Sequence, residues 1–128
     1  AESLAQYIKE KIGFDSSVSP LENETLKDHI KNSDIIVNTT SIGMKEKDSP
    51  LLPLELLCNK NLVCDIVYNP LETPLLKGAK IMGARTLNGL GMLIYQGALS
   101  FKIWTGKEFP VELVRKTLTK ALTGNLPK

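Results

Sequence analysis

The sequence has few of the residues that build metal sites and disulfide frameworks. Its 128 residues include two cysteines, Cys58 and Cys64, and one histidine, His29. The cysteines do not form a Cys-x-x-Cys pair, and the histidine is distant from both in the sequence, so the spacing argues against a zinc site. We therefore predict no metal site, a surface position for His29, and two buried, reduced thiols in a cytoplasmic protein.

The sequence also lacks long apolar runs and an excess of charge of one sign. No run approaches the roughly 18 apolar residues of a membrane span, and no basic segment followed by an apolar one opens the chain. The 16 basic and 14 acidic residues are spread along the sequence. These features argue against membrane insertion and against nucleic-acid binding, which would gather basic residues on one face.

What is present is the pattern of a small α/β domain. Hydrophobic residues make up 42% of the chain, enough for a core. Nearly continuous apolar runs, typical of strands buried on both faces of a parallel sheet, alternate with segments of helical period. We expect strands at 34–40, 61–68 and 84–87, and helices at 1–13, 23–31, 74–83, 88–106 and 111–124. This alternation predicts a parallel sheet with flanking helices.

Polar residues gather where the predicted strands end. In open parallel sheets, ligands bind beyond the carboxyl ends of the strands. Each group alone is also typical of an ordinary turn, because Asn, Thr and Gly favour turns for backbone reasons. Three groups at one edge nevertheless predict a ligand cleft, and they are residues 38–41, 68–69 and 86–89.

The stretch NGLGMLIYQGALSFKIW, residues 88–104, is not a dinucleotide phosphate loop. The Gly-x-Gly-x-x-Gly fingerprint would require a third glycine at position 94, which is Ile94. Gly89 can instead bring the start of a helix close to a ligand. Gly89, Met92 and Gln96 recur at helical spacing on one stripe. On spacing alone, Met92 and Gln96 fit a ligand-binding face and a structural role, with Gln96 bonded to a neighbouring backbone group, equally well.

Asp65 lies in an apolar strand, where a carboxylate requires hydrogen-bond donors. We interpret it as a residue that holds an adjacent loop through backbone N–H groups, in preference to a catalytic residue. No lysine stands at a strand end where it could act with Asp65, so the sequence provides no acid–base pair.

Three segments together resemble the C-terminal part of shikimate dehydrogenase. They are DIIVNTTSIGM, DIVYNPLETPLLKGAK and NGLGMLIYQGALSFKIWTG, in this order and with suitable gaps. The resemblance covers residues 3–122. It implies that residues 1–128 are the C-terminal portion of an NADP-binding domain, with C-terminal helices that close over the substrate cleft. The implied fold is an incomplete Rossmann-like, doubly wound α/β domain.

The resemblance also implies roles for particular residues. Asn38, Thr40 and Ser41 would border the cofactor NADP, and Ile66, Gly89 and Met92 would line the nicotinamide region. Tyr68 and Gln96 would bind shikimate or 3-dehydroshikimate. The catalytic lysine and aspartate of the family, its glycine-rich phosphate loop and its Asn-Arg-Thr motif would lie upstream, so we expect no catalytic residue in this chain.

The implied function is NADP-dependent reduction of 3-dehydroshikimate to shikimate in aromatic amino-acid biosynthesis, with no turnover by this chain alone. Two alternatives stay open. One is a non-catalytic remnant that acts as an assembly or binding module, as a homodimer or swapped oligomer through an exposed sheet edge. The other is a quinate/shikimate dehydrogenase paralogue.

Overall fold

The computed structural model describes residues 1–21, 23–45 and 47–124, which form two compact units divided between residues 32 and 33. The first unit contains helices α1 (Glu2–Ile12) and α2 (Asn23–Asn32). α1 ends at Gly13, whose φ of 72° is left-handed. Both helices and the glycine stop confirm the pattern in the sequence.

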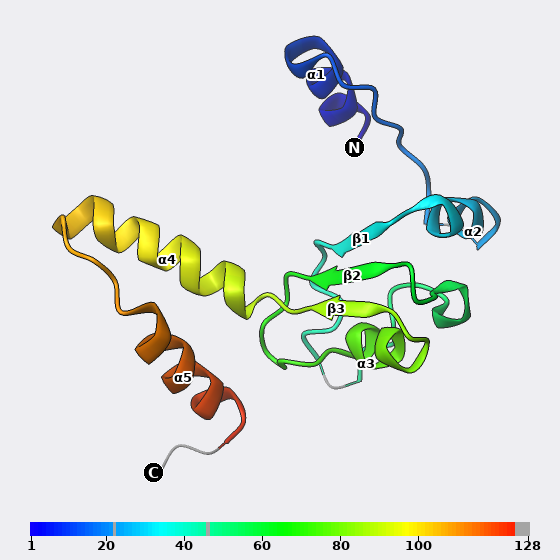
Figure 1. The fold of residues 1–128 in the computed structure, drawn as a ribbon. Helices are drawn as coiled ribbons and strands as arrows, with labels where there is room; N and C mark the ends of the chain where they lie inside the picture. The colour runs from blue at the N-terminus through cyan, green and yellow to red at the C-terminus, as the bar shows by residue number, and fades with distance from the viewer. Residues whose placement is uncertain (22, 46, 125–128) are drawn as a thin grey trace. The chain divides into compact units, whose positions relative to one another are not determined.

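The second unit is built on a three-stranded parallel sheet. Its strands are β1 (Ile35–Asn38), β2 (Leu62–Asp65) and β3 (Arg85–Leu87), in the order β1-β2-β3. Ile35 pairs with Leu62, which pairs in turn with Arg85. The predicted α/β class with a parallel sheet and flanking helices is confirmed. The carboxyl ends of the strands lie at one edge, from which α4 also departs (Figure 1).

The first two strands are shorter than predicted. β1 ends at Asn38 instead of Thr40, and β2 ends at Asp65 instead of Tyr68. The strands end early because backbone N–H groups beyond these residues donate to side chains, so the regular hydrogen bonds between strands stop. The Val67 N–H donates to the Asp65 carboxylate at 3.0 Å, and the Thr40 N–H donates to the Asn38 side-chain oxygen at 3.0 Å. The backbone therefore turns directly after each of these two strands.

Helix α3 (Pro74–Ile81) covers one face of the sheet. It begins as the sequence predicts, with Thr73 as N-cap and Pro74 in the first turn. Leu75, Leu76 and Ala79 on this helix are buried, as is Val63 of β2. The 3₁₀ turn η1 (Leu54–Leu56) packs on the same helix. The core of the second unit therefore lies between α3 and the sheet, where burial of apolar surface stabilises the fold.

The opposite face of the sheet is largely open. Ile35 and Val37 of β1 and Leu87 of β3 are more than half exposed. Cys64, between Val37 and Leu87, is half-buried, and Cys58 is exposed. The prediction that both thiols are buried is therefore wrong. Cys58 follows the η1 turn at the surface, and Cys64 points to the face that α3 does not cover.

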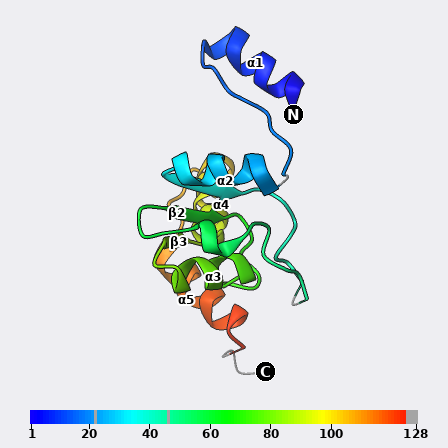
Figure 2. The same ribbon diagram turned by 90° about the vertical axis from the view of Figure 1, so that its right-hand side faces the viewer.

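Two helices complete the second unit. α4 (Leu90–Thr105) follows β3 directly and is seen nearly end-on in Figure 2. α5 (Val111–Leu122) packs against α4. Phe101 and Phe109 meet edge to face at 5.5 Å, and the Arg115 guanidinium lies 5.5 Å from the centre of the Tyr95 ring. Within the described ranges, no helix is both long and apolar enough to cross a membrane.

Candidate functional site

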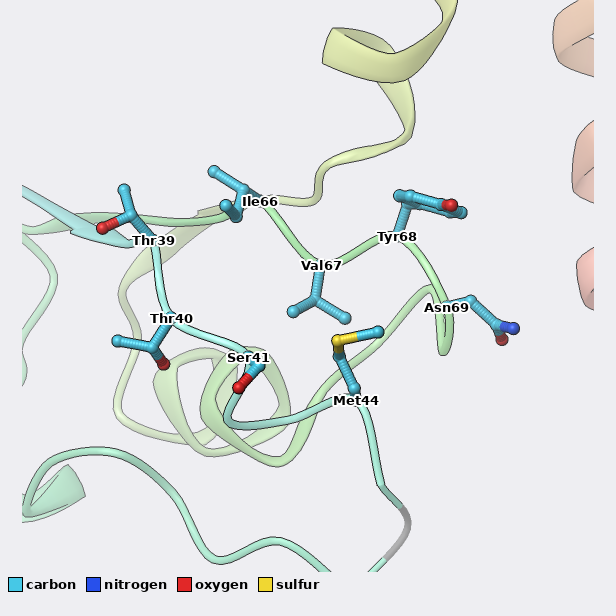
Figure 3. Close-up of a pocket in the computed structure, with 8 residues that line it drawn as sticks. All are labelled: Thr39, Thr40, Ser41, Met44, Ile66, Val67, Tyr68 and Asn69. Carbon is cyan, nitrogen blue, oxygen red and sulfur yellow. The ribbon is translucent and has the colours of Figure 1, made fainter.

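A pocket opens at the carboxyl ends of β1 and β2, between the turns that follow them. Its volume is about 480 Å³, within the range of small-molecule sites. Figure 3 shows one wall from the β1 turn and the other from the β2 turn, with the side chains of Met44 and Val67 directed toward each other. The eight lining residues are Thr39, Thr40, Ser41, Met44, Ile66, Val67, Tyr68 and Asn69.

Behind the pocket, a buried polar network joins the two turns to α3. The Asn38 amide donates to the Asp65 carboxylate at 3.1 Å and to the Ile42 carbonyl at 3.0 Å. The Thr73 hydroxyl donates to the other Asp65 oxygen at 2.7 Å and accepts the Leu76 N–H at 3.3 Å. Every buried polar atom here is thus paired, which holds both walls in one arrangement.

The interpretation of Asp65 as a structural residue is confirmed. Asp65 is 2% exposed, and its side chain accepts the Val67 N–H, as expected of a residue that holds a neighbouring loop. It also binds two side chains, Asn38 and Thr73, which the sequence did not identify as its partners. This carboxylate therefore positions the pocket walls and does not line the pocket.

A second carboxylate, Asp48, holds the outer part of the β1 turn. One of its oxygens accepts the Gly43 N–H at 2.8 Å and the Lys45 N–H at 3.1 Å. The hydrogen bond from Gly43, then that from Lys45 together with the Lys45 charge, holds the pKa of Asp48 below its ordinary value. Asp48 is therefore a charged acceptor at neutral pH.

The pocket is chemically neutral. None of its eight lining residues carries a charge, and Tyr68 alone among them bears a titratable side chain. Met44, Ile66 and Val67 supply apolar surface, and Thr40 and Ser41 are polar. The Thr40 hydroxyl is used within the turn, where it donates to the Asn38 side-chain oxygen at 2.8 Å and accepts the Ile42 N–H at 3.1 Å. Such a pocket fits a flat ring with a polar substituent. It contains no pair of groups for proton transfer.

The structure brings together half of the residues that the sequence singled out. Thr40, Ser41, Ile66 and Tyr68 line the pocket. Asn38 does not line it, because its side chain is buried behind the wall and is used by Asp65, Ile42 and Thr40.

The predicted residues of α4 and its approach lie outside this pocket. Gly89 is buried against the β2 turn, with its N–H 3.2 Å from the Val67 carbonyl. Met92 is 55% exposed on α4. Gln96 is also exposed, and its amide donates to the Leu93 carbonyl in the preceding turn at 2.9 Å. Gln96 thus has the backbone partner that one of its two interpretations required.

Two lining residues, Met44 and Val67, were not singled out from the sequence. Met44 and Val67 are apolar, as core residues and many loop residues are. Nothing in the sequence indicates that they face each other. Thr39 and Asn69 stand within the polar groups at the strand ends, so their position did carry a signal.

Known proteins match this chain closely. The family model described as the shikimate 5'-dehydrogenase C-terminal domain matches residues 89–119. The shikimate dehydrogenase (NADP(+)) of Methanopyrus kandleri is 39% identical over 124 residues, which are 95% of this chain and 43% of that protein. The chain is homologous to the C-terminal part of the shikimate dehydrogenase family.

Solved shikimate dehydrogenases share the fold. A crystal structure of the enzyme in complex with NADP+ has a TM-score of 0.84 and is 41% identical. This match covers 94% of the present chain and 42% of the crystallised chain. The Listeria monocytogenes enzyme, in complex with shikimate and NAD, has a TM-score of 0.84 and is 38% identical. This match covers 91% of the present chain and 42% of the Listeria chain. The chain therefore spans about two fifths of the length of the shikimate dehydrogenases it matches.

Proposed function

We propose that this chain is part of an NADP-dependent shikimate dehydrogenase that reduces 3-dehydroshikimate to shikimate in the cytoplasm. The observation that carries the proposal is the match of nearly the whole chain to a solved shikimate dehydrogenase in complex with NADP+. The neutral pocket at the carboxyl ends of β1 and β2 supports it, since parallel sheets bind nucleotide cofactors at this edge.

The pocket is the proposed site of the nicotinamide ring. Its apolar walls would contact the faces of the ring, Ser41 would offer its hydroxyl group to the carboxamide, and Thr40 would border the ring. Ile66 belongs to the same wall, with Gly89 packed behind it, and Met92 follows on α4. Bound NADPH would supply the hydride, and the chain would supply position and shelter from water.

Tyr68 and Gln96 are the proposed contacts to the substrate. Both side chains are exposed, and Tyr68 projects from the β2 turn on the side away from Val67 (Figure 3). The Tyr68 hydroxyl and the Gln96 amide can bind the hydroxyl and carboxylate groups of the substrate ring without breaking a buried hydrogen bond. In this proposal residues 1–128 form the C-terminal portion of the cofactor domain, with α4 and α5 beside the substrate.

Cofactor binding can be tested on the chain itself by methyl NMR. The chain has three methionines, Met44, Met82 and Met92, which give separate reporters when labelled with ¹³C. Titration with NADP+ should shift the methyl signals of Met44 and Met92 and leave that of Met82, which follows α3, unchanged.

Two observations would count against the proposal. One is a titration in which Met82 moves as much as Met44, which would indicate nonspecific binding. The other is a titration in which no methyl moves up to millimolar NADP+. As a control, NADPH oxidation with 3-dehydroshikimate should show no turnover by the chain alone, since no acid–base pair lines the pocket.

A second candidate function is assembly through β1, the outer strand of the sheet, and the exposure of β1 favours it. Ile35 and Val37 are 60% and 52% exposed. Among the described residues, no strand pairs with β1 on the side opposite β2. An open, apolar edge strand is a template for pairing with another chain. We propose that two copies of this chain pair there, and sedimentation of the isolated chain tests it.

A further inference from the structure

Met44 stands on an exposed turn, yet it forms part of a pocket wall. Met44 is 59% exposed and its side chain has three rotatable bonds, so side-chain packing on its own does little to fix it. Its backbone N–H donates to the Ser41 carbonyl at 3.3 Å, which is a long hydrogen bond. The position of Met44 must therefore be set by the residues on either side of it.

Asp48 binds both of those residues. A single carboxylate oxygen accepts the N–H of Gly43, which precedes Met44, and the N–H of Lys45, which follows it. The Asp48 N–H donates in return to the Lys45 carbonyl at 3.0 Å. The carboxylate thus closes the turn on both sides of Met44.

The turn that Asp48 closes is anchored to the buried network. Gly43 is buried and has a φ of 105°, a conformation that only glycine adopts readily. A Cβ atom at Gly43 would lie 3.3 Å from Cβ and Cγ2 of Thr73. Gly43 therefore lies against the residue that caps α3, and Asp48 ties Met44 to this fixed point.

We propose that Asp48 is a positioning residue that holds Met44 opposite Val67 and so sets the width of the pocket. The proposal rests on the proposed function in one respect: the ligand whose binding depends on this width is the nicotinamide ring. Asp48 does not itself line the pocket and need not contact the ligand.

The chemistry of Asp48 explains why a carboxylate suits this position. Hydrogen bonds from N–H groups to an ionised acceptor are about twice as strong as neutral ones. Asparagine keeps an acceptor oxygen but loses the charge, whereas alanine loses the acceptor altogether. The two variants should therefore weaken the turn to different degrees.

The experiment compares the wild-type chain with Asp48→Asn and Asp48→Ala. Glu55→Gln, which neutralises an exposed carboxylate on η1, serves as the matched control. Amide hydrogen exchange at Gly43 and Lys45 and the ¹³C methyl signal of Met44 are measured without ligand. In Asp48→Ala, exchange at both amides should accelerate on the order of fivefold or more, and the Met44 methyl should shift toward its random-coil value. Asp48→Asn should lie between this variant and wild type.

NADP+ titration then connects the turn to ligand binding. The Kd should rise on the order of fivefold in Asp48→Ala and less in Asp48→Asn, with the urea unfolding midpoint and the Met82 signal unchanged. Glu55→Gln should match wild type throughout. If Asp48→Ala does not fold, the same measurements on Asp48→Asn decide.

The outcomes separate this inference from the proposed function. Unchanged amide exchange and an unchanged Met44 methyl in Asp48→Ala would overturn the role of Asp48, whatever the ligand. So would wild-type affinity for NADP+ in that variant. If wild type binds no NADP+ but the turn loosens in Asp48→Ala, the positioning role stands and the proposed function fails.

Discussion

Several polar side chains that look like ligand contacts are occupied by the fold. Asn38, Asp65 and Thr73 are each at most 2% exposed, and their hydrogen bonds connect the two turns with the start of α3. Thr40 and Ser41, further along the β1 turn, line the pocket, and the Thr40 hydroxyl also donates to Asn38. At the scale of single residues, the site therefore consists of a buried polar support and a neutral lining in front of it.

Replacing Thr73 by valine should show how much this support contributes. Valine keeps the shape that packs on Gly43 but removes the hydroxyl that caps α3 and donates to Asp65. Loss of the cap and of a donor to a buried carboxylate should lower the free energy of unfolding by about 2–3 kcal/mol. Urea unfolding followed by circular dichroism measures it.

The matched control is Thr73→Ser, which restores the hydroxyl and removes only a methyl group. It should cost about 1 kcal/mol, close to the value of one buried methyl or methylene group. If the valine variant were as stable as the serine variant, packing of the methyl groups would matter more than the hydroxyl, and the network would contribute little.

Local signals were sufficient for some of these residues and not for others. The Thr73-Pro74 cap was predictable because both partners of the cap are close in sequence. The polar network around Asp65 was not, because its donors Asn38 and Thr73 lie 27 and 8 residues away. Met44 was missed for the same reason, because the side chain that faces it, Val67, belongs to the β2 turn (Figure 3).

At the scale of elements, the approach of α4 to the β2 turn depends on one glycine. A Cβ atom on Gly89 would lie 2.0 Å from the Ile66 carbonyl oxygen, whereas one on Gly91 would meet nothing within 4 Å. The two glycines of the Gly-x-Gly sequence therefore differ in role. Gly89 permits close packing of two backbones, and Gly91 is an ordinary residue of the helix.

The two glycines should respond in opposite directions to alanine. Gly89→Ala forces α4 or the Ile66 turn to move and should destabilise the chain by about 1–3 kcal/mol. Gly91→Ala adds a good helix former in open space and should stabilise it by about 0.5–1 kcal/mol. Thermal and urea unfolding of both variants provide the comparison.

The Met44 signal gives this prediction a second readout. Gly89→Ala should also shift the Met44 methyl, because displacement of Ile66 moves the facing wall of the pocket, while Gly91→Ala should leave it in place. Equal effects of the two variants would show that the contact at Ile66 relaxes without cost.

Elements were predictable where their pattern is long and periodic. α4 and its stop at Gly106, α5, and α1 with its stop at Gly13 follow from apolar spacing and a terminal glycine. The role of Gly89 could not be derived in this way. Sequence spacing placed it at a helix start, but only the packed structure shows that its close neighbour is the Ile66 backbone.

At the scale of the second unit, the sheet is stabilised on one face and open on the other. α3 covers Val63 and Asp65, while Ile35, Val37 and Leu87 remain exposed. The Asp34 and Asn38 carbonyls accept N–H groups of Leu62 and Ile66, so they face β2. Because backbone groups alternate along a strand, those of Ile35 and Val37 point away from β2 and are placed to pair with another strand.

This geometry makes the assembly proposal testable with one substitution. Val37→Lys places a charge on the outer strand and removes an exposed apolar side chain, leaving the hydrogen bonds between β1 and β2 intact. If two copies pair along β1, sedimentation should show a dimer for the wild-type chain at high concentration and a monomer for the variant at the same concentration. Leu113→Lys on α5 is the matched control, since it removes a residue that is 65% exposed from a helix distant in sequence from β1.

A wild-type monomer would contradict the proposal. Dissociation by Leu113→Lys and not by Val37→Lys would contradict it as well, because the contact would then lie on the C-terminal helices. A dimer that responds only to Val37→Lys would establish that β1 lies in the interface between the two copies.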